Sequence, residues 1–354
     1  MANWEVERVH EIEMRSDTTT QPTDAMRRAM HDAVVGDEGY GDDPTIRRLE
    51  ELAAEKVGKE ASVFCVSGTL ANLLAVMCHT IRGDEIICED EAHIFWYESA
   101  GLALLPAVQP FLVTGDRLRV LDPDRVKAAL KPISSGPSRR VLCLENTHNR
   151  GGGTVTPVET MRRLYDVAHA GGLKVHLDGA RVFNAAHALE VPVTEITKNC
   201  DSMMFCLSKG LSAPMGSMLC GTKDFIDQAR KFRKAVGGGL RQAGVVAAAG
   251  VVAIETMIDR LPEDHKTARI LAEGLAEIPG IDIDLESVQT NIVAYDVSGT
   301  GMDAPTYVRK LASRGIKCTS HTQTRIRMVT HKDVTQDDAR QALMIIREVV
   351  EESR

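Results

Sequence analysis

Apolar runs of strand length alternate with helix-like segments through the middle of the chain, from about residue 60 to residue 220. Parallel strands need a crossover connection, and helices usually supply it, so this alternation predicts an α/β fold with a mostly parallel sheet. Polar residues that follow such strands meet at one edge of the sheet, where open α/β proteins bind ligands. The strands are expected at 61–66, 84–88, 108–113, 140–144, 173–177, 203–207 and 216–221.

Two of these runs deliver reactive side chains at their ends. Residues 173–177 are followed by Asp178 and Arg181, and residues 203–207 are followed by Lys209. A carboxylate for a pyridinium nitrogen and a lysine able to form an imine are what pyridoxal phosphate (PLP) requires of a protein. Two ordinary strand ends with a surface lysine are the alternative interpretation, and this stretch alone leaves both open.

The pattern changes near both ends of the chain. Residues 23–258 are expected to form a large α/β domain, while 1–22 and 259–354 combine an N-terminal segment with a small α+β domain. The expected helices in the large domain include 24–35, capped by Thr23, then 45–56, 223–236 and 240–258. In the small domain we expect helices at 266–277, 305–314 and 336–350, with strands at 281–297 and around Lys317 and Arg327.

Composition restricts the classes of partner. The 354-residue chain has a net charge of -8 and only 4% aromatic residues, which argues against nucleic acid and anionic membranes. Eight cysteines without a CxxC pair indicate reduced thiols, so no metal and no disulfide framework is expected. The charged N-terminus does not resemble a signal peptide and no apolar run reaches ~18 residues, which predicts a cytoplasmic protein.

Common catalytic and nucleotide-binding motifs are missing. The chain has no GxGxxG after a strand, no GxxxxGK[ST], no HExxH and no GxSxG. Ser67, Gly68 and Thr69 open a buried helix, whose first backbone N–H groups can bind an anion. From these three residues alone, a simple N-cap is the favoured interpretation.

At this point a family resemblance becomes specific. The chain resembles the threonine aldolases, PLP enzymes of the aspartate-aminotransferase fold (type I), in motifs that run in order from about residue 13 to residue 345. These motifs are RSDTTT at 15–20, GDEGYGDDPT at 36–45, SGTLAN at 67–72, ENTHN at 145–149, HLDGAR at 176–181, SKG at 208–210, GGGLRQ at 237–242 and IRMVTHKDV at 326–334.

The resemblance implies roles around the cofactor. Lys209 resembles the imine-forming lysine, Asp178 the carboxylate on the pyridine nitrogen, and His93 the imidazole stacked on the ring. The phosphate is expected to be held by a group of residues of which Arg241 would come from a neighbouring subunit: Ser67, Gly68, Thr69, Lys234 and Arg241. Their structural alternatives are a surface lysine, a helix cap, a packed histidine and a solvated basic face.

It also implies roles around the substrate. Ser16, Arg181 and Arg327 resemble a clamp on the substrate carboxylate, with Arg181 beside the cofactor as well, because an arginine fork matches a carboxylate at two points. His148 resembles a second histidine near the β-hydroxyl. The base that takes the hydroxyl proton stays open between His148, His93 and a bound water. Arg325 lies outside the match and is interpreted as structural.

The implied activity is cleavage of L-threonine or L-allo-threonine to glycine and an aldehyde by a homo-oligomer, a dimer or tetramer with shared active sites. Another PLP-dependent β-eliminating lyase and a catalytically silent PLP-binding protein are the alternatives. One stretch departs from the family pattern: residues 88–101, CEDEAHIFWYESAG, surround His93 with more acidic and aromatic residues than expected. This departure concerns the pocket for the β-substituent.

Overall fold

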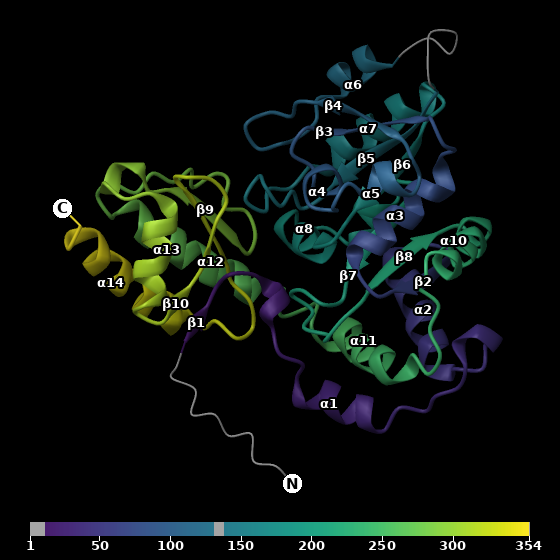
Figure 1. Ribbon diagram of the computed structural model, residues 1–354, viewed down its shortest axis with the longest axis horizontal. Helices are drawn as coiled ribbons and strands as arrows, with labels where there is room; N and C mark the ends of the chain where they lie inside the picture. The colour runs from purple at the N-terminus through teal and green to yellow at the C-terminus, as the bar shows by residue number, and fades with distance from the viewer. Residues whose placement is uncertain (1–10, 131–137, 354) are drawn as a thin grey trace. The chain divides into compact units, whose positions relative to one another are not determined.

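The computed structural model describes residues 11–130 and 138–353, which divide into two compact units. The larger unit holds the described residues of 20–262, and the smaller one combines 11–19 with 263–353 (Figure 1). Each unit has a hydrophobic core of its own.

A seven-stranded sheet forms the centre of the larger unit, in the order β2-β8-β7-β6-β5-β3-β4. Only β8 runs against its neighbours β7 and β2, so the predicted mostly parallel sheet is confirmed. The short connection between β7 and β8 explains the exception, because a parallel crossover needs a dozen or more residues. The strands are β2 (Ala61–Cys65), β3 (Glu85–Glu89), β4 (Gln109–Val113), β5 (Arg139–Glu145), β6 (Lys174–Asp178), β7 (Ser202–Cys206) and β8 (Ser217–Gly221).

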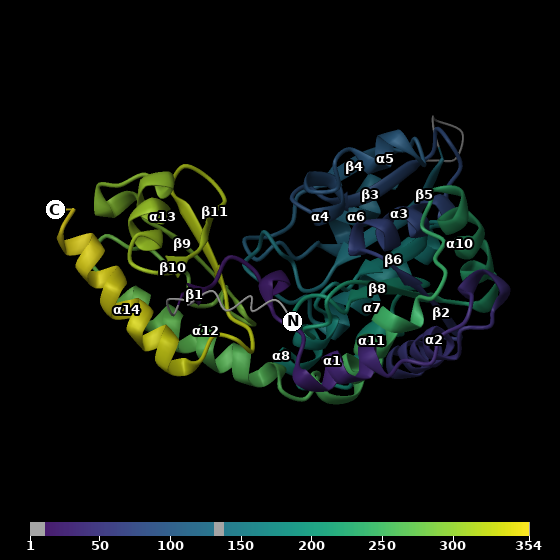
Figure 2. The ribbon, with the colours of Figure 1, turned by 60° about the horizontal axis from the view of Figure 1, so that its bottom comes forward.

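Helices cover both faces of this sheet, and alternation along the strands decides which side chain meets which layer. Phe64 of β2 packs toward α2 and α11, whereas Val63 and Cys65 pack toward α3 and α10. The α3 side holds α3 (Gly68–His79), α10 (Lys223–Ala235), α4 (His93–Trp96) and α5 (Gly101–Leu104). The opposite side holds α1 (Asp24–His31), α2 (Pro44–Val57), α6 (Pro123–Ala129), α7 (Val158–Ala170), α8 (Val182–Ala188), α9 (Val193–Thr197) and α11 (Gly244–Thr256). Figures 1 and 2 both show α1, α2 and α11 side by side.

The smaller unit is an α+β structure. A three-stranded antiparallel sheet, β11-β12-β9, packs with the helices around the buried rings of Tyr295 and Tyr307, and β1 pairs with β10 in parallel. Its elements are β1 (Ile12–Glu13), β9 (Ile292–Asp296), β10 (Ile316–Lys317), β11 (Thr319–Ser320), β12 (Arg325–Val329), α13 (Ala304–Ala312), α14 (Gln336–Glu351) and most of α12 (Leu261–Ala276). Short 3-10 turns lie at Asp17–Thr19, Glu38–Tyr40 and Ser298–Thr300.

Several predicted boundaries were wrong. The helix expected at 24–35 is capped by Thr23 as predicted but ends at His31, and Val34 beyond it is exposed rather than packed. The helix expected at 240–258 begins at Gly244, because the Arg241 carbonyl accepts the N–H of Glu38 at 3.1 Å instead of continuing a helix. The strands expected at 281–297 reduce to β9 and one isolated bridge. No helix within the described ranges combines the length and the apolar character needed to cross a membrane.

Candidate active site

A row of polar side chains lies on the sheet face that α3 covers. His176 and Asp178 are two residues apart on β6, so both point to this face. The strand register then places Ser202 of β7 beside His176 and Glu145 of β5 beside Asp178. Most other buried residues on this face are apolar, such as Cys143 and Met204, with Ser217 as a further polar residue that bonds to Cys206. The row therefore marks the place where the fold keeps buried polar groups.

Asp178 is the centre of this row and is only 6% exposed. Its Oδ2 accepts a hydrogen bond from Asn72 Nδ2 at 2.8 Å, and its Oδ1 accepts one from the backbone N–H of Ala180 at 3.0 Å. Burial by itself raises the pKa of this carboxyl. The positive charges of His93 and Lys209 and the two hydrogen bonds outweigh burial and hold the pKa below its usual value. Asp178 is therefore an ionised carboxylate in the interior.

His93 begins α4, and its ring lies close to Asp178 and Glu98, with one ligand atom of each within 4.8 Å of the others. The space around these three side chains is called the pocket below. Its backbone N–H donates to Glu145 Oε2 at 2.6 Å, and its ring Nδ1 contacts Glu98 Oε1 at 3.1 Å. Burial lowers the pKa of this imidazole, but the bond to Glu98 and the charges of Asp178 and Glu145 raise it above its ordinary value. No other hydrogen bond holds the ring within the described residues, so Nε2 is available to a ligand.

Glu98 and Asp178 are two buried carboxyl groups in one pocket. Burial and the neighbouring charge of Asp178 raise the pKa of Glu98, so the two carboxyls differ in their tendency to ionise. Together with His93 they bring three ligand atoms within 4.8 Å of one another, which is also a geometry that a metal ion can use.

His148 lies in a different environment and is 3% exposed. Its Nε2 contacts Glu89 Oε2 at 3.0 Å, and its Nδ1 accepts the backbone N–H of Gly151 at 3.1 Å. Burial lowers the pKa of this ring, but the charges of Glu145 and Glu89 raise it above its ordinary value. Both ring nitrogens of His148 are thus engaged inside the chain, unlike those of His93.

Ser67, Gly68 and Thr69 begin α3 directly after β2. The Ser67 hydroxyl accepts the N–H of Leu70 at 3.2 Å, so Ser67 is an N-cap, as the simpler interpretation required. A Cβ on Gly68 would lie 2.8 Å from Met204 Cε, which explains the glycine at this closely packed position. Ser67 and Thr69 are exposed, and the first turn of a 12-residue helix still offers backbone N–H groups to an anion.

Lys209 and Arg181 follow neighbouring strands of the same sheet. Lys209 lies three residues beyond β7, and its carbonyl accepts hydrogen bonds from Ser212 N at 2.8 Å and from Thr20 Oγ1 at 3.1 Å. Arg181 precedes α8 and is 6% exposed. The larger unit thus brings together Lys209, Asp178 and His93, since the charge of Lys209 acts on both of the other groups.

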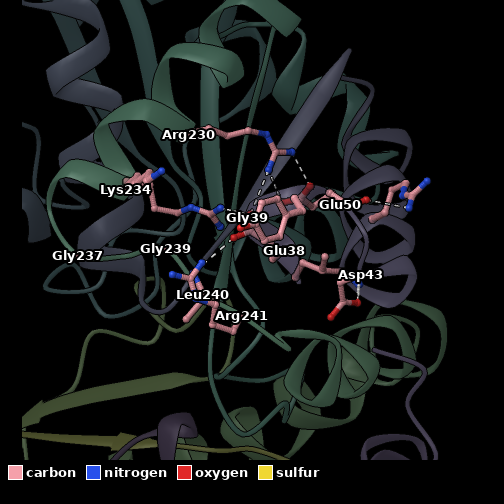
Figure 3. Close-up of a pocket in the computed structure, with 15 residues that line it drawn as sticks. Glu38, Gly39, Asp43, Glu50, Arg230, Lys234, Gly237, Gly239, Leu240 and Arg241 are labelled. Carbon is pink, nitrogen blue, oxygen red and sulfur yellow. Dashed lines mark hydrogen bonds and ion pairs between the residues drawn. The ribbon is translucent and has the colours of Figure 1, made fainter. Parts of the chain in front are cut away.

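Lys234 and Arg241 line a cleft of about 930 Å³ between the loop 36–44 and α10 (Figure 3). Glu38 fastens this loop, since it forms an ion pair with Arg233 and its N–H donates to the Arg241 carbonyl. The Arg241 side chain is 73% exposed and lies 3.6 Å from Asp37 Oδ1. No hydrogen bond or ion pair holds the exposed Lys234 side chain among the described residues. The cleft therefore presents two cations to solvent.

Ser16 and Arg327 belong to the smaller unit, while Arg181 belongs to the larger one. Arg327 is 8% exposed, and its Nη1 donates to the Arg15 carbonyl at 3.2 Å. Ser16 follows directly, and its Oγ accepts the N–H of Thr18 at 3.2 Å. Within the smaller unit, two members of the expected carboxylate clamp are neighbours.

Sequence reasoning missed the residues that support these groups, above all Asn72, His176 and Glu98. Two signals were present in the sequence. Asn72 is the one polar residue between Leu70 and Cys78 of its helix, and His176 precedes Asp178 by the strand period of two. Buried polar groups in such positions need partners, so each pointed to a hydrogen-bond network.

Comparisons with known proteins place these features in context. A family model described as beta-eliminating lyase matches residues 13–298. The chain is 42% identical over 337 residues to low-specificity L-threonine aldolase 1 of Arabidopsis thaliana, a match that covers 94% of each chain. It is 41% identical over 327 residues to the low specificity L-threonine aldolase of Escherichia coli, covering 92% of this chain and 95% of the relative.

Among solved structures, the threonine aldolase of Leishmania major superposes with a TM-score of 0.82 at 17% identity, covering 96% of this chain and 99% of that one. At this identity the likeness shows the fold, and it confirms the predicted aspartate-aminotransferase-like class.

Proposed function

Because this chain belongs to the beta-eliminating lyase family and, within it, to the threonine aldolases, we propose that it is a PLP-dependent aldehyde-lyase. Its reaction is the cleavage of L-threonine and L-allo-threonine, and of related β-hydroxy-α-amino acids, to glycine and an aldehyde.

The observation that carries this proposal is the buried Asp178 carboxyl, held by Asn72 and Ala180, whose pKa the charges of His93 and Lys209 keep below its usual value. A carboxylate that stays charged in the interior suits a protonated pyridine nitrogen, and a nearby lysine suits the carbonyl carbon of PLP. When bound, PLP accepts the electrons of the Cα–Cβ bond that breaks. The donor set present here therefore fits this cofactor.

The chain's own groups bind and orient. Lys209 Nζ is the group that would hold the carbonyl carbon of PLP, and the first turn of α3 would hold its phosphate. Arg181, Arg327 and Ser16 fix the substrate carboxylate. Holding the carboxylate would limit the rotation of the substrate, so that the Cα–Cβ bond could be oriented for cleavage.

A base must take the proton of the β-hydroxyl. His93 Nε2, directly or through a bound water, is the group we assign, because this nitrogen has no other hydrogen bond in the described chain. It acts in the neutral form of the ring, in which Nδ1–H donates to Glu98 Oε1 and Nε2 carries the lone pair. His148 is assigned an orienting role, since Glu89 and Gly151 occupy both of its ring nitrogens. A general base contributes ~10²–10⁴-fold to rate, so its loss should slow the reaction without abolishing it.

The proposal extends to assembly and location. The exposed cations of Lys234 and Arg241 support a homo-oligomer, dimer or tetramer, in which Arg241 reaches the phosphate in a neighbouring chain. All eight cysteines are unpaired and all but Cys78 are buried, which supports a reducing, cytoplasmic location.

The test offers purified protein L-threonine, L-allo-threonine, L-serine and the D-isomers, and follows aldehyde and glycine against pyruvate and ammonia. Aldehyde with an equal amount of glycine is expected. Pyruvate and ammonia as the main products would instead identify a β-eliminating lyase. Borohydride reduction followed by peptide mapping should find the cofactor on Lys209, and a label on another lysine would refute its role.

A further inference from the structure

A chain of buried hydrogen bonds connects Asp178 with the other end of α3. His79 Nε2 contacts Ser202 Oγ at 2.7 Å, and Ser202 Oγ contacts His176 Nδ1 at 3.0 Å. His176 Nε2 then contacts Asn72 Oδ1 at 3.1 Å. Asn72 Nδ2 donates to Asp178 Oδ2 and to Glu98 Oε1, both at 2.8 Å. The chain thus ends on the two carboxyl groups of the pocket.

Which group donates in each hydrogen bond of this network follows from the ionised Asp178 at its end. An ionised Asp178 only accepts hydrogen bonds, so the NH₂ group of Asn72 faces the carboxyls and its oxygen faces His176. His176 must then carry its proton on Nε2, which leaves Nδ1 to accept the Ser202 hydroxyl. That hydroxyl in turn accepts from His79. All donors therefore point toward Asp178.

Burial keeps this arrangement fixed. Asn72 is 1% exposed, and His176 and Ser202 are fully buried. Burial lowers the pKa of His176 to about 3 and that of His79 to about 4, so both rings are neutral and each keeps one tautomer at neutral pH. In a low-dielectric interior, aligned hydrogen bonds strengthen one another.

We propose that Asn72 and His176 are positioning residues for the cofactor: His176 fixes the Asn72 amide, and the two N–H groups of that amide hold Asp178 and Glu98 in place. This inference rests on the proposed function, because Asp178 is the group that meets the pyridine nitrogen. Neither Asn72 nor His176 is assigned a contact with the substrate. Their effect reaches the cofactor through the direction and charge of Asp178.

The need for such an amide follows from the pocket. Carboxyl oxygens of Glu98 and Asp178 lie within 4.8 Å of each other, and one donor group between them offsets their repulsion. Titratable groups from several neighbouring segments act on this pair or on its partners: His93, Cys143, Glu145, His176 and Lys209. Loss of the amide should therefore change how Asp178 ionises, and with it the pH dependence of the bound cofactor.

The experiment titrates apoprotein with PLP, in EDTA because the His93, Glu98 and Asp178 trio could also take a divalent cation. It measures the dissociation constant and the absorbance of bound PLP against pH. The matched pair is His176→Gln and His176→Leu. The glutamine amide can still donate to Asn72 Oδ1, whereas leucine only fills space.

We expect His176→Gln to resemble the wild type in both readouts. His176→Leu should bind PLP about tenfold more weakly or worse, the scale of a lost hydrogen bond in a charged network, and should shift the absorbance profile. Asn72→Leu should have the larger effect. A packing role alone would lower the melting temperature of both His176 variants without moving the profile.

Identical behaviour of His176→Gln and His176→Leu, or wild-type binding and profile in Asn72→Leu, would overturn the inference. If these variants do not fold, Ser202→Ala provides the test, because it removes the hydrogen bond between the Ser202 hydroxyl and His176 Nδ1. A smaller shift of the profile in the same direction is then expected, and an unchanged profile would overturn the inference. Failure of wild-type apoprotein to bind PLP would instead refute the proposed function.

Discussion

The pocket around Asp178 and the cleft around Arg241 differ in the exposure of their charged side chains and in the partners of those side chains. In the pocket, the carboxyls of Asp178 and Glu98 are buried and receive donors from Asn72, Ala180 and His93. In the cleft, the Arg241 side chain is 73% exposed, and its nearest carboxylate oxygen lies 3.6 Å away. In the pocket, the hydrogen bonds to the carboxyls all come from the same chain. In the cleft, cationic side chains are exposed to an anion from outside the chain.

This difference shows which parts of the site a single chain can build. An interior carboxylate must be satisfied before a ligand arrives, because an unpaired buried charge is costly. A solvent-exposed arginine does not have this free-energy cost, because water solvates its charge until an anion binds. The pocket should therefore be sensitive to geometry, and the cleft mainly to charge and to the presence of a second subunit.

The largest expected effect concerns the second subunit. Arg241→Ala and Lys209→Ala chains should each form poor or inactive homo-oligomers. Mixed under conditions of subunit exchange, they should regain activity, because one site then combines the intact Lys209 of one chain with the intact Arg241 of the other. The measurement is aldehyde release before and after exchange.

The control for this mixture is a pair of Lys209→Ala and Asp178→Asn chains. Both of those changes lie in the pocket, so a mixed oligomer contains no intact site and activity should stay low. Absence of recovery in the first mixture, with mixed oligomers verified by mass, would mean that Arg241 acts within its own chain or has no role at the phosphate.

A smaller effect should separate geometry from charge. Arg327→Lys should keep PLP bound but weaken glycine binding about tenfold, because a point charge replaces a two-point fork at a buried position. Arg241→Lys is the matched variant at an exposed position and should change PLP affinity much less than Arg241→Ala. Glycine affinity is measured by titration of the bound cofactor's absorbance. Unchanged glycine affinity in Arg327→Lys would remove this residue from the clamp.

The smallest effect concerns a second interior pair, His148 and Glu89. The pKa of His148 is raised in the folded chain, so its contribution to stability is complete below its ordinary value of 6.5 and is lost as pH rises through the folded pKa. The pKa of Glu89 is lowered, so its contribution is present above 4.5 and is lost as pH falls. The difference in unfolding free energy between wild type and His148→Gln should therefore be largest between pH 4.5 and pH 6.5 and should decrease toward pH 9.

Urea unfolding of apoprotein at several pH values measures this difference. Thr23→Ala is the control, since loss of the N-cap of α1 costs about 1 kcal/mol and involves no group that titrates in this range. If the loss of unfolding free energy in His148→Gln is as independent of pH as the loss in Thr23→Ala, the pair with Glu89 does not govern the charge of His148.

The sequence predicted the strands of the sheet and the residues at their ends more reliably than the residues that hold the side chains of the site in place. The strand that ends in Asp178 and the strand that precedes Lys209 were placed to within one residue, because short runs rich in apolar residues have clear ends in the sequence. The helix before Val35 and the one after Arg241 were drawn too long, because periodicity does not reveal where a backbone carbonyl finds a partner elsewhere. Asn72 escaped attention for a related reason: its role depends on β6 and on Glu98, between α4 and α5, both remote from it in sequence.

Helix α3 carries the predicted phosphate-binding residues Gly68 and Thr69 on its first turn and Asn72 within the next. The three steps along the helix from Thr69 to Asn72 rise about 4.5 Å along the axis. With the phosphate at the first turn of α3 and the ring nitrogen at Asp178, which Asn72 holds, this rise would fix the separation between the two ends of the cofactor site. Inserting or deleting one residue there would turn Asn72 by about 100° away from the sheet. Homologous chains should therefore vary the side chains of this stretch while preserving its length.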